Sequence, residues 1–299
     1  MAKGKRDAVD AETYRFKIGT FDCISLNDGY HDYEVGGFFA NIPLTTVQKA
    51  LEARKAPIDR VPSTYSVLYI NTVNNRVLID TGVGGLLPNT GLLRTALAGE
   101  EIRVEDVDTI IITHAHPDHI GGLLDDQDQP IYPNARIYTW KREWDFWLDE
   151  HAIEKFNSQM AIDLTRHIHA RIEPYLLYIE PDCEVVPGIT TLDARGHTPG
   201  HMVVLVESVN EKLLYISDTV FHPLHLEHPD WLPMSRYMIE PEQYVQSKRS
   251  VLDMAVEKNA LVHATHFAPF PSLGHVAREE DSWAWHPVEP FSFISSPDG

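Results

Sequence analysis

The chain has 299 residues, of which 43% are hydrophobic and 10% aromatic, enough apolar material for one large core or two modest ones. Its formal net charge of -19 repels polyanions, so we expect no nucleic-acid partner. No apolar stretch approaches the roughly 20 residues that span a bilayer, and the first ten residues are too polar for a signal peptide, so we expect a cytoplasmic protein without membrane contact.

The order of predicted elements indicates one domain. We expect a flexible tail over residues 1–12, where charged and small residues mix without periodicity, and a single domain over residues 13–299. Single strands are predicted over 16–29, 104–113, 135–140 and, as the last buried strand, 259–267. Hairpins are predicted over 65–82, with a turn near Asn74 and Asn75, and over 202–218. Helices are predicted within 141–172, where apolar residues recur every three or four positions, and over 241–257.

A cluster of imidazole and carboxylate side chains follows a short apolar strand. His114, His116, Asp118 and His119 stand within six residues, directly after the run that ends at Thr113. Both chemical groups bind Zn²⁺ and similar divalent metals, and residues spaced by two on a turning loop converge where a regular strand would splay them. One metal needs three or four ligands, so four candidates here, with more elsewhere, predict a dinuclear centre.

Further candidate ligands follow later predicted strands. Asp218 comes directly after an apolar strand, where a carboxylate is placed to bridge two cations. Histidines in comparable positions are His197, His201, His222, His263 and His266. A single histidine is more often structural than functional, so each position alone is a weak indication.

Together these segments resemble the metallo-β-lactamase superfamily. Its pattern is a strand ending in Asp-x-Gly, then His-x-His-x-Asp-His, a Gly-His, an Asp and a late His. The chain supplies these in the same order, as IDTG at 79–82, HAHPDH at 114–119, GHTPGH at 196–201, SD at 217–218 and HF at 266–267. The resemblance implies an α+β fold, a four-layer αββα sandwich with the metals held by loops at one edge.

The same resemblance implies a role for each matching residue. One metal is expected on His114, His116 and His197, the other on Asp118, His119 and His266, with Asp218 as the bridge between them. We therefore expect two divalent ions per chain, with Zn²⁺ as the first choice and Mn, Co or Fe as alternatives. Asp80 matches the aspartate of the first motif, which accepts a hydrogen bond from a ligand histidine. His201 and His263 are expected to be structural.

Residues around the last histidine indicate a branch of the superfamily. The segments 134–147 and 266–285 resemble the methyl parathion hydrolase-like branch, in which Pro-Phe-Pro and a Gly-His follow the last ligand. N-acyl homoserine lactonases form a sister branch with Asp after that histidine, where this chain has Phe267. Ala268 departs from the first branch, which has Pro there. Glyoxalase II enzymes share the ligands, but the sequence lacks the basic helical domain that they use for glutathione.

The charge of the predicted centre indicates its chemistry. Two divalent cations offset by Asp118 and Asp218 leave roughly +2, enough to deprotonate a bridging water, whose pKa on zinc falls to about 7. That hydroxide is the expected nucleophile, which makes Asp118 and Asp218 the predicted catalytic residues without any Ser or Cys nucleophile. We expect it to cleave an ester-type bond in a neutral, fairly hydrophobic small molecule, such as a lactone, an aryl ester or a phosphotriester.

Aromatic residues predict where the substrate binds. Phe267, the WDFW segment at 144–147 and the Pro-Phe-Pro tail together indicate a hydrophobic mouth. The candidates for its wall are Phe38, Phe39, Trp144, Trp147 and His222. Two tryptophans three apart on a helix are also compatible with an ordinary place in the core.

Two other functions are compatible with the same ligands. One is a glyoxalase II-like thioesterase, which the net charge of -19 disfavours because it slows the approach of anions such as S-lactoylglutathione. The other is a non-catalytic metal-binding module; the ligand count leaves room for water at each metal, which favours an enzyme. The oligomeric state stays open, with a homodimer as one alternative.

Overall fold

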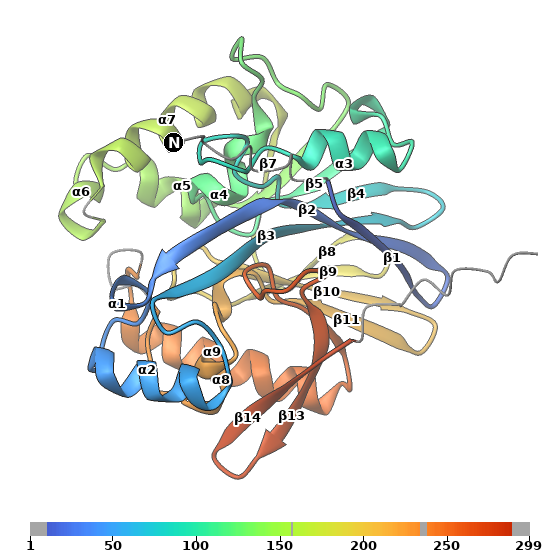
Figure 1. Ribbon diagram of the computed structural model, residues 1–299. Coiled ribbons are helices and arrows are strands. Elements are labelled where there is room, and N and C mark those ends of the chain that lie inside the picture. The colour runs from blue at the N-terminus through green and yellow to red at the C-terminus, as the bar shows by residue number, and fades with distance from the viewer. Residues whose placement is uncertain (1–10, 157, 234–237, 289–299) are drawn as a thin grey trace, which may run out of the picture.

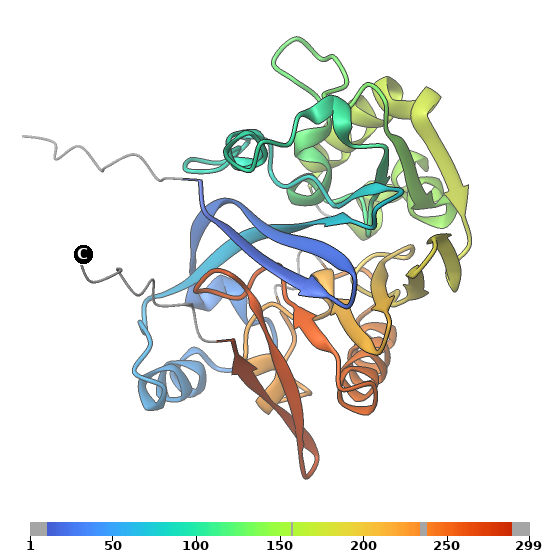
Figure 2. The same ribbon diagram turned by 90° about the vertical axis from the view of Figure 1, so that its right-hand side faces the viewer.

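The computed structural model describes residues 11–156, 158–233 and 238–288. Within them, two seven-stranded sheets face each other, and helices cover the outer face of each sheet (Figures 1 and 2). This arrangement confirms the predicted αββα sandwich. In the same residues, no helix is both long enough and apolar enough to cross a bilayer.

The first sheet is built from the N-terminal half of the chain, with neighbouring strands in sequence order. Its strands are β1 (Thr13–Ile18), β2 (Phe21–Glu34), β3 (Arg60–Asn71), β4 (Arg76–Ile79), β5 (Thr109–Ile111), β6 (Arg136–Trp140) and β7 (Leu176–Ile179). The helices of this half are α1 (Val35–Phe38), α2 (Leu44–Ala53), α3 (Leu93–Gly99), η1 (Val104–Asp106), α4 (Pro117–Ile120), η2 (Gly121–Leu123), α5 (Lys141–Leu148), α6 (Ala152–Lys155), α7 (Gln159–Ile172) and η3 (Glu173–Tyr175). The strands β1 to β4 pair antiparallel, whereas β4 to β7 pair parallel.

The second sheet is built from the C-terminal half, in the order β14-β13-β12-β11-β10-β9-β8. Its strands are β8 (Cys183–Val186), β9 (Ile189–Asp193), β10 (Met202–Ser208), β11 (Glu211–Tyr215), β12 (Leu261–His263), β13 (Leu273–Glu279) and β14 (Ser282–Pro287). The helices of this half are η4 (Ser217–Thr219), α8 (Leu224–Glu227) and α9 (Pro241–Glu257). The pair β11 and β12 is parallel, and the other pairs are antiparallel.

Apolar side chains on successive strand residues point to opposite faces, so both faces of each sheet are buried. In β3, Val67 and Tyr69 point outward and pack with α3 and α7, whereas Leu68 and Ile70 point into the space between the sheets. In β10, the outward residues pack with α9 and the inward ones meet those of the first sheet. The result is an apolar core between the sheets and one on each outer side.

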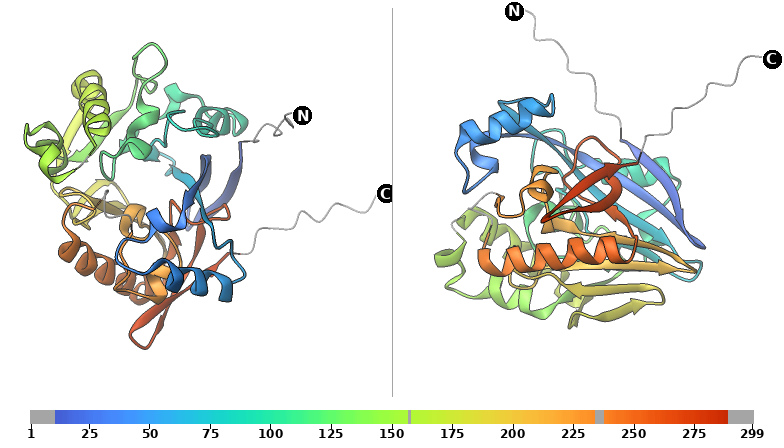
Figure 3. Two further views of the ribbon diagram at one scale, coloured as in Figure 1. Left: turned by 60° about the vertical axis from the view of Figure 1, so that its left-hand side comes forward. Right: turned by 90° about the horizontal axis from the view of Figure 1, so that it is seen from below.

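The parallel strand pairs determine where the candidate ligands emerge. Because β4, β5 and β6 run parallel, their carboxyl ends meet at one edge of the first sheet, and β11 and β12 do the same in the second sheet. Loops at the carboxyl ends of parallel strands are the usual place for ligand sites. A further apolar cluster joins α1 and α2 to Phe221 and to α8. Figure 3 shows the ribbon of the same molecule from two further sides.

Two parts of the fold differ from the prediction. The predicted strand 16–29 contains a hairpin turn: β1 ends at Ile18, Gly19 has a φ of 55°, and β2 begins at Phe21. Glycine takes this left-handed conformation without strain, so the chain reverses where the side-chain alternation alone indicated one strand. The predicted last buried strand, β12, is followed by the hairpin of β13 and β14, which packs Val276 and Trp283 against α9.

Other boundaries agree more closely with the sequence. The predicted turn at Asn74 and Asn75 is confirmed as the connection between β3 and β4, and the helical region 141–172 consists of α5, α6 and α7. Residues 1–10 of the predicted tail lie outside the described residues, and so does the predicted domain end at 299. At the inner end of that tail, Glu12 accepts a hydrogen bond of 2.9 Å from the Asn27 side chain.

Candidate metal centre

The candidate ligands lie on loops that follow strands of both sheets. The segment after β5 supplies His114 and His116, and α4 supplies Asp118 and His119. The second sheet supplies His197 after β9, Asp218 after β11 and His266 after β12. The structure therefore brings together residues that are up to half the chain apart.

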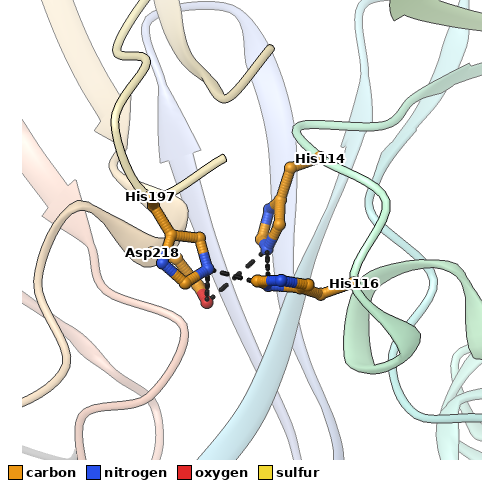
Figure 4. Close-up of side chains that lie close together, drawn as sticks. All are labelled: His114, His116, His197 and Asp218. Atoms are coloured by element: carbon orange, nitrogen blue, oxygen red, sulfur yellow. Dashed lines mark hydrogen bonds and ion pairs between the residues drawn. The ribbon is translucent and has the colours of Figure 1, made fainter. Parts of the chain in front are cut away.

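Four of these side chains form the first ligand group: His114, His116, His197 and Asp218 (Figure 4). His116 Nδ1 lies 3.0 Å from His114 Nε2 and 2.8 Å from His197 Nε2. Asp218 Oδ2 lies 3.1 Å from His197 Nε2 and 3.6 Å from His114 Nε2. All four residues are buried, and their ligand atoms point to one centre.

The second ligand group consists of Asp118, His119, Asp218 and His266. Asp218 Oδ1 lies 3.1 Å from His119 Nε2 and 3.0 Å from His266 Nε2. Asp118 Oδ2 lies 3.8 Å from His119 Nε2 and 3.7 Å from His266 Nε2. Asp218 thus offers one carboxylate oxygen to each ligand group, whereas the Asp118 side chain is 24% exposed and reaches solvent.

The spacing and surroundings of these atoms fit metal ions. Within each group the ligand atoms lie within 4.8 Å of one another, and the ligands of one tetrahedral zinc are about 3.3 Å apart. In the described structure, His119 Nε2, His266 Nε2 and Asp218 Oδ1 are buried and face one another at 3.0–3.1 Å, but none of them has a hydrogen-bond partner. Buried polar atoms normally have such a partner, so nitrogen and oxygen atoms that converge without one fit a cation between them.

The protonation equilibria of the histidines differ between the groups. Burial, together with the neighbouring His119, holds the pKa of His114 well below its usual range, which leaves its imidazole neutral. Burial also lowers the pKa of His119, but the carboxylates of Asp218, Asp80 and Asp118 outweigh it and raise that pKa well above the usual range. A metal ion must displace this proton, so metal binding in the second ligand group weakens as the pH falls.

Asp80 orients His119 from the side opposite Asp218. Its side chain is fully buried, and its Oδ2 accepts a hydrogen bond of 2.8 Å from His119 Nδ1. The same oxygen accepts from the Tyr215 hydroxyl at 3.0 Å, and Oδ1 accepts from the Thr113 backbone N–H at 2.9 Å. With Nδ1 as the donor, the Nε2 of His119 presents its lone pair to the ligand group.

His201 and His263 lie near the centre but face other partners. His201 Nδ1 donates to the Ala194 carbonyl at 2.9 Å, and its Nε2 accepts from the Asp218 backbone N–H at 3.2 Å. His263 Nε2 lies 2.9 Å from the Ser25 hydroxyl, and its ring stacks on Tyr215. Both rings hold protein groups in place, and neither belongs to a ligand group.

Comparison with known families agrees with this geometry. The family model of the metallo-beta-lactamase superfamily matches residues 59–266, a segment that contains both ligand groups. The chain belongs to the metallo-β-lactamase superfamily. Its methyl parathion hydrolase-like branch stays a prediction.

Known proteins match this chain over different lengths. An N-acyl homoserine lactonase of Bacillus sp. is 29% identical over 159 residues, which are 46% of this chain and 56% of that relative. The chain therefore spans about half the length of this curated relative. Among solved structures, AidC, a dizinc quorum-quenching lactonase in complex with the product N-hexanoyl-L-homoserine, has a TM-score of 0.88 and 27% identity, covering 94% of this chain and 98% of AidC. The hydrolase AbOPH of the beta-lactamase superfamily has a TM-score of 0.82 and 25% identity, covering 93% and 98%.

The two tryptophans predicted to line the pocket lie in the core of this metallo-β-lactamase fold. Trp144 is 1% exposed, and its Nε1 donates to Thr139. Trp147 is 0% exposed, and its ring packs edge-on against His116 and Phe156. Both pocket assignments are therefore wrong, because neither ring has surface to offer a substrate. Trp147 instead supports a ligand histidine.

Phe267 does not form a hydrophobic mouth either. It is 2% exposed and packs edge-on against Trp285 in the core beneath the second sheet. The side chain after the last ligand histidine thus points away from the metal centre. The sequence predicted an apolar opening at Phe267, whereas its side chain contributes to the core beneath the second sheet.

The other predicted pocket residues adjoin the centre through an aromatic residue that the sequence analysis missed. Phe221 stacks on His266 with ring centroids 5.0 Å apart and also contacts His197, so it touches both ligand groups. The ring centroids of Phe38 and Phe221 lie 6.3 Å apart, and Phe39 packs with Phe38. Phe38 and Phe39 are 0% and 4% exposed, so their rings, like those of the two tryptophans, offer almost no surface to a substrate in this structure. The half-buried His222 contacts both Phe38 and Phe39. No motif marks Phe221; its place three residues after Asp218 is the one signal in the sequence.

Proposed function

We propose that the protein is a dinuclear metal-dependent hydrolase that opens lactones of neutral, fairly hydrophobic acyl compounds. The observation that carries this proposal is the shared carboxylate of Asp218, which offers one oxygen to each of two ligand groups. A shared carboxylate and two adjacent groups of ligands suit a pair of cations that act on one substrate.

The proposed chemistry divides between the ions and the protein. When bound, two divalent ions supply Lewis acidity and make water acidic enough to yield hydroxide near neutral pH. The buried His114, His116 and His197 would hold one ion, and Asp118, His119 and His266 would hold the other, with Asp218 offering one oxygen to each. Substrate would approach from the exposed side of Asp118. There the carboxylate would accept the proton that the attacking water loses and pass it to the alkoxide oxygen that leaves as the ring opens.

The substrate class is supported by relatives and by charge. AidC and the Bacillus relative are lactonases, and AidC resembles this chain over nearly its whole length. The net charge of -19 disfavours anionic substrates such as S-lactoylglutathione, which speaks against the thioesterase alternative. A non-catalytic metal-binding module is disfavoured because Asp118 opens the second ligand group to solvent, whereas structural zinc sites are closed.

The test is a substrate panel on protein with a measured metal content. It includes N-hexanoyl homoserine lactone, a p-nitrophenyl ester, an aryl phosphotriester and S-lactoylglutathione. We expect two metals per chain and a kcat/KM for the lactone at least about 100-fold above that for S-lactoylglutathione, roughly 2.7 kcal/mol of transition-state stabilisation.

The other outcomes of the panel are equally informative. Preference for the phosphotriester or the aryl ester would retain the hydrolase and replace the lactone as its substrate. Preference for S-lactoylglutathione would establish the thioesterase alternative. Two bound metals without turnover of any ester would favour the non-catalytic module, and fewer than two metals after remetallation would contradict the dinuclear centre.

A further inference from the structure

A buried carboxylate in α5 lies behind the first ligand group. Glu143 is 0% exposed, and its neighbours in the helix, Trp144 and Trp147, belong to the core. Burying a carboxylate among apolar side chains is costly unless hydrogen bonds replace its hydration. Glu143 therefore requires several donors, and their identity indicates what the residue does.

Four hydrogen bonds satisfy the two oxygens of Glu143. Oε1 accepts from the Ala115 backbone N–H at 2.9 Å and from Trp147 Nε1 at 2.7 Å. Oε2 accepts from the Thr198 hydroxyl at 2.7 Å and from the Gly200 backbone N–H at 2.9 Å. One side chain thus joins a loop of the first sheet to a loop of the second.

The partners of Oε1 fix the turn between two ligand histidines. Ala115 stands between His114 and His116, and its carbonyl oxygen accepts a hydrogen bond of 3.0 Å from the Thr165 hydroxyl in α7. The peptide unit is therefore held on both sides, through its N–H by Glu143 and through its C=O by Thr165. Rotation of this peptide would move both imidazoles out of the first ligand group.

The partners of Oε2 fix the loop that carries the third histidine. Thr198 follows His197 directly, and a Cβ on Gly200 would lie 2.5 Å from the backbone nitrogen of Glu143. Any residue larger than glycine would push this loop away from α5. From the same loop, His201 accepts the backbone N–H of Asp218, so the network continues to the shared ligand.

We propose that Glu143 is a positioning residue that holds the loops of the first ligand group in register, so that its loss weakens metal binding there selectively. This inference rests on the proposed metal centre. The hydrogen bonds of Glu143 reach Ala115 and Thr198, which adjoin ligands of the first group, and Gly200 on the same loop as Thr198. His119 in the second group is oriented by Asp80 instead.

The substitution Glu143→Gln tests the proposal with little change in shape. The glutamine amide replaces one of the two accepting oxygens with an NH₂ group, which can only donate. Depending on how the amide is turned, this NH₂ group faces the backbone N–H of Ala115 or that of Gly200, and the hydrogen bond there is lost. Loss of such an outer hydrogen bond typically weakens a metal site by about 10- to 100-fold. We expect this loss in the first ligand group and a change below about twofold in the second.

Single-site backgrounds identify which group is affected. His266→Ala keeps all four residues of the first ligand group, and His197→Ala keeps all four of the second, so each variant should bind one cobalt ion with its own absorption spectrum. Glu143→Gln should weaken cobalt binding, measured by chelator competition, in the His266→Ala background and not in the His197→Ala background. Equal losses in both backgrounds, or no loss in either, would overturn the inference.

Two controls separate positioning from folding. Ile162→Ala removes a fully buried core side chain of α7 that belongs to neither ligand group, and it should lower the melting temperature without selective loss of cobalt. If Glu143→Gln fails to fold, Thr198→Val removes one of the four hydrogen bonds and should give the same selectivity in weaker form. Equal cobalt losses in both backgrounds from that variant would also overturn the inference. Fewer than two metals on the unaltered protein would contradict the proposed centre rather than the role of Glu143.

Discussion

Asp80 Oδ2 lies 2.8 Å from His119 Nδ1, and both side chains are fully buried. The contact fixes the tautomer of His119, because a donating Nδ1 leaves Nε2 as the ligand atom. Asp80 also accepts hydrogen bonds from Thr113 and Tyr215, so its own position is rigid. The pair therefore sets the direction in which His119 points.

Replacing Asp80 with Asn should test this relationship. The amide keeps the size of the side chain but weakens the acceptor that faces His119, so we expect metal affinity in the second ligand group to fall about 10- to 100-fold. Competition with a chromophoric chelator measures it. Unchanged affinity of both groups would contradict the orienting role of Asp80.

Asp218→Ala should affect both ligand groups at once. The change removes the oxygen offered to each group and a negative charge between two cations, so we expect kcat/KM to fall by roughly 10³-fold or more, about 4 kcal/mol. Steady-state kinetics and elemental analysis of the same sample are the measurements. A variant that keeps two metals and near-normal turnover would show that Asp218 is not the shared ligand.

His266 and His263 stand three residues apart and should behave differently. His266→Ala should release one metal, since His266 Nε2 faces both Asp118 and Asp218. His263→Ala should keep two metals and lose about 1–3 kcal/mol of stability, because its contact with Ser25 is removed. Metal analysis and urea unfolding separate the two outcomes. Metal loss from His263→Ala would mean that the ligand assignment in this segment is wrong.

Lys248 should make stability depend on pH. This fully buried residue of α9 donates to the Trp231 carbonyl, and burial, reinforced by the charge of Arg249, lowers its pKa to about 7. The unfolded chain has the ordinary lysine pKa of 10.5, so between pH 7 and pH 10.5 it binds more protons than the folded chain, and stability rises with pH. Below pH 7 both states are protonated, and the folded chain bears the full cost of the buried charge.

The variant Lys248→Met removes that cost. Its gain in unfolding free energy over the unaltered protein should be largest below pH 7 and should shrink as the pH rises towards 10. Urea unfolding of both proteins at a series of pH values provides the comparison. A gain that stays constant across the series would contradict the lowered pKa.

Phe221 should influence the choice of acyl chain. Its ring stacks on His266 and packs with Phe38, so Phe221→Ala removes apolar surface beside the centre. We expect kcat/KM for lactones with long acyl chains to fall roughly 10-fold relative to short ones, with both metals retained. Trp144→Phe is the matched control, since it alters a core ring away from the ligand groups. Equal losses of kcat/KM for long and short acyl chains would show that Phe221 contributes to packing and not to the choice of substrate.

Four of the candidate ligands stand close together in the sequence, because His114, His116, Asp118 and His119 follow one short strand. His197, Asp218 and His266 each follow another strand, and their assignment came from the resemblance to the superfamily. The αββα layers followed from the resemblance. The turn at Gly19 was missed because the side-chain alternation continues on both sides of it.

Other residues could not be placed because their roles depend on contacts between distant segments. Trp144 and Trp147 have a spacing that fits a pocket wall or a core face, and only the packing of α5 against α7 distinguishes the two. Glu143 reads as an ordinary acidic residue in the first turn of a helix. Its partners, Ala115 and Thr198, lie on loops that the sequence gives no reason to pair with it.

Each ligand group draws on both sheets, and this has a consequence for how the protein matures. The second ligand group requires Asp118 from the first sheet and His266 from a loop after β12. As the chain leaves the ribosome, this pair cannot meet until nearly the whole sandwich has been synthesised and β12 has joined its sheet. In the proposed dinuclear hydrolase, full metal loading would therefore be a late event, and a polypeptide that stops before residue 266 would lack a complete second site however much of the first sheet had formed.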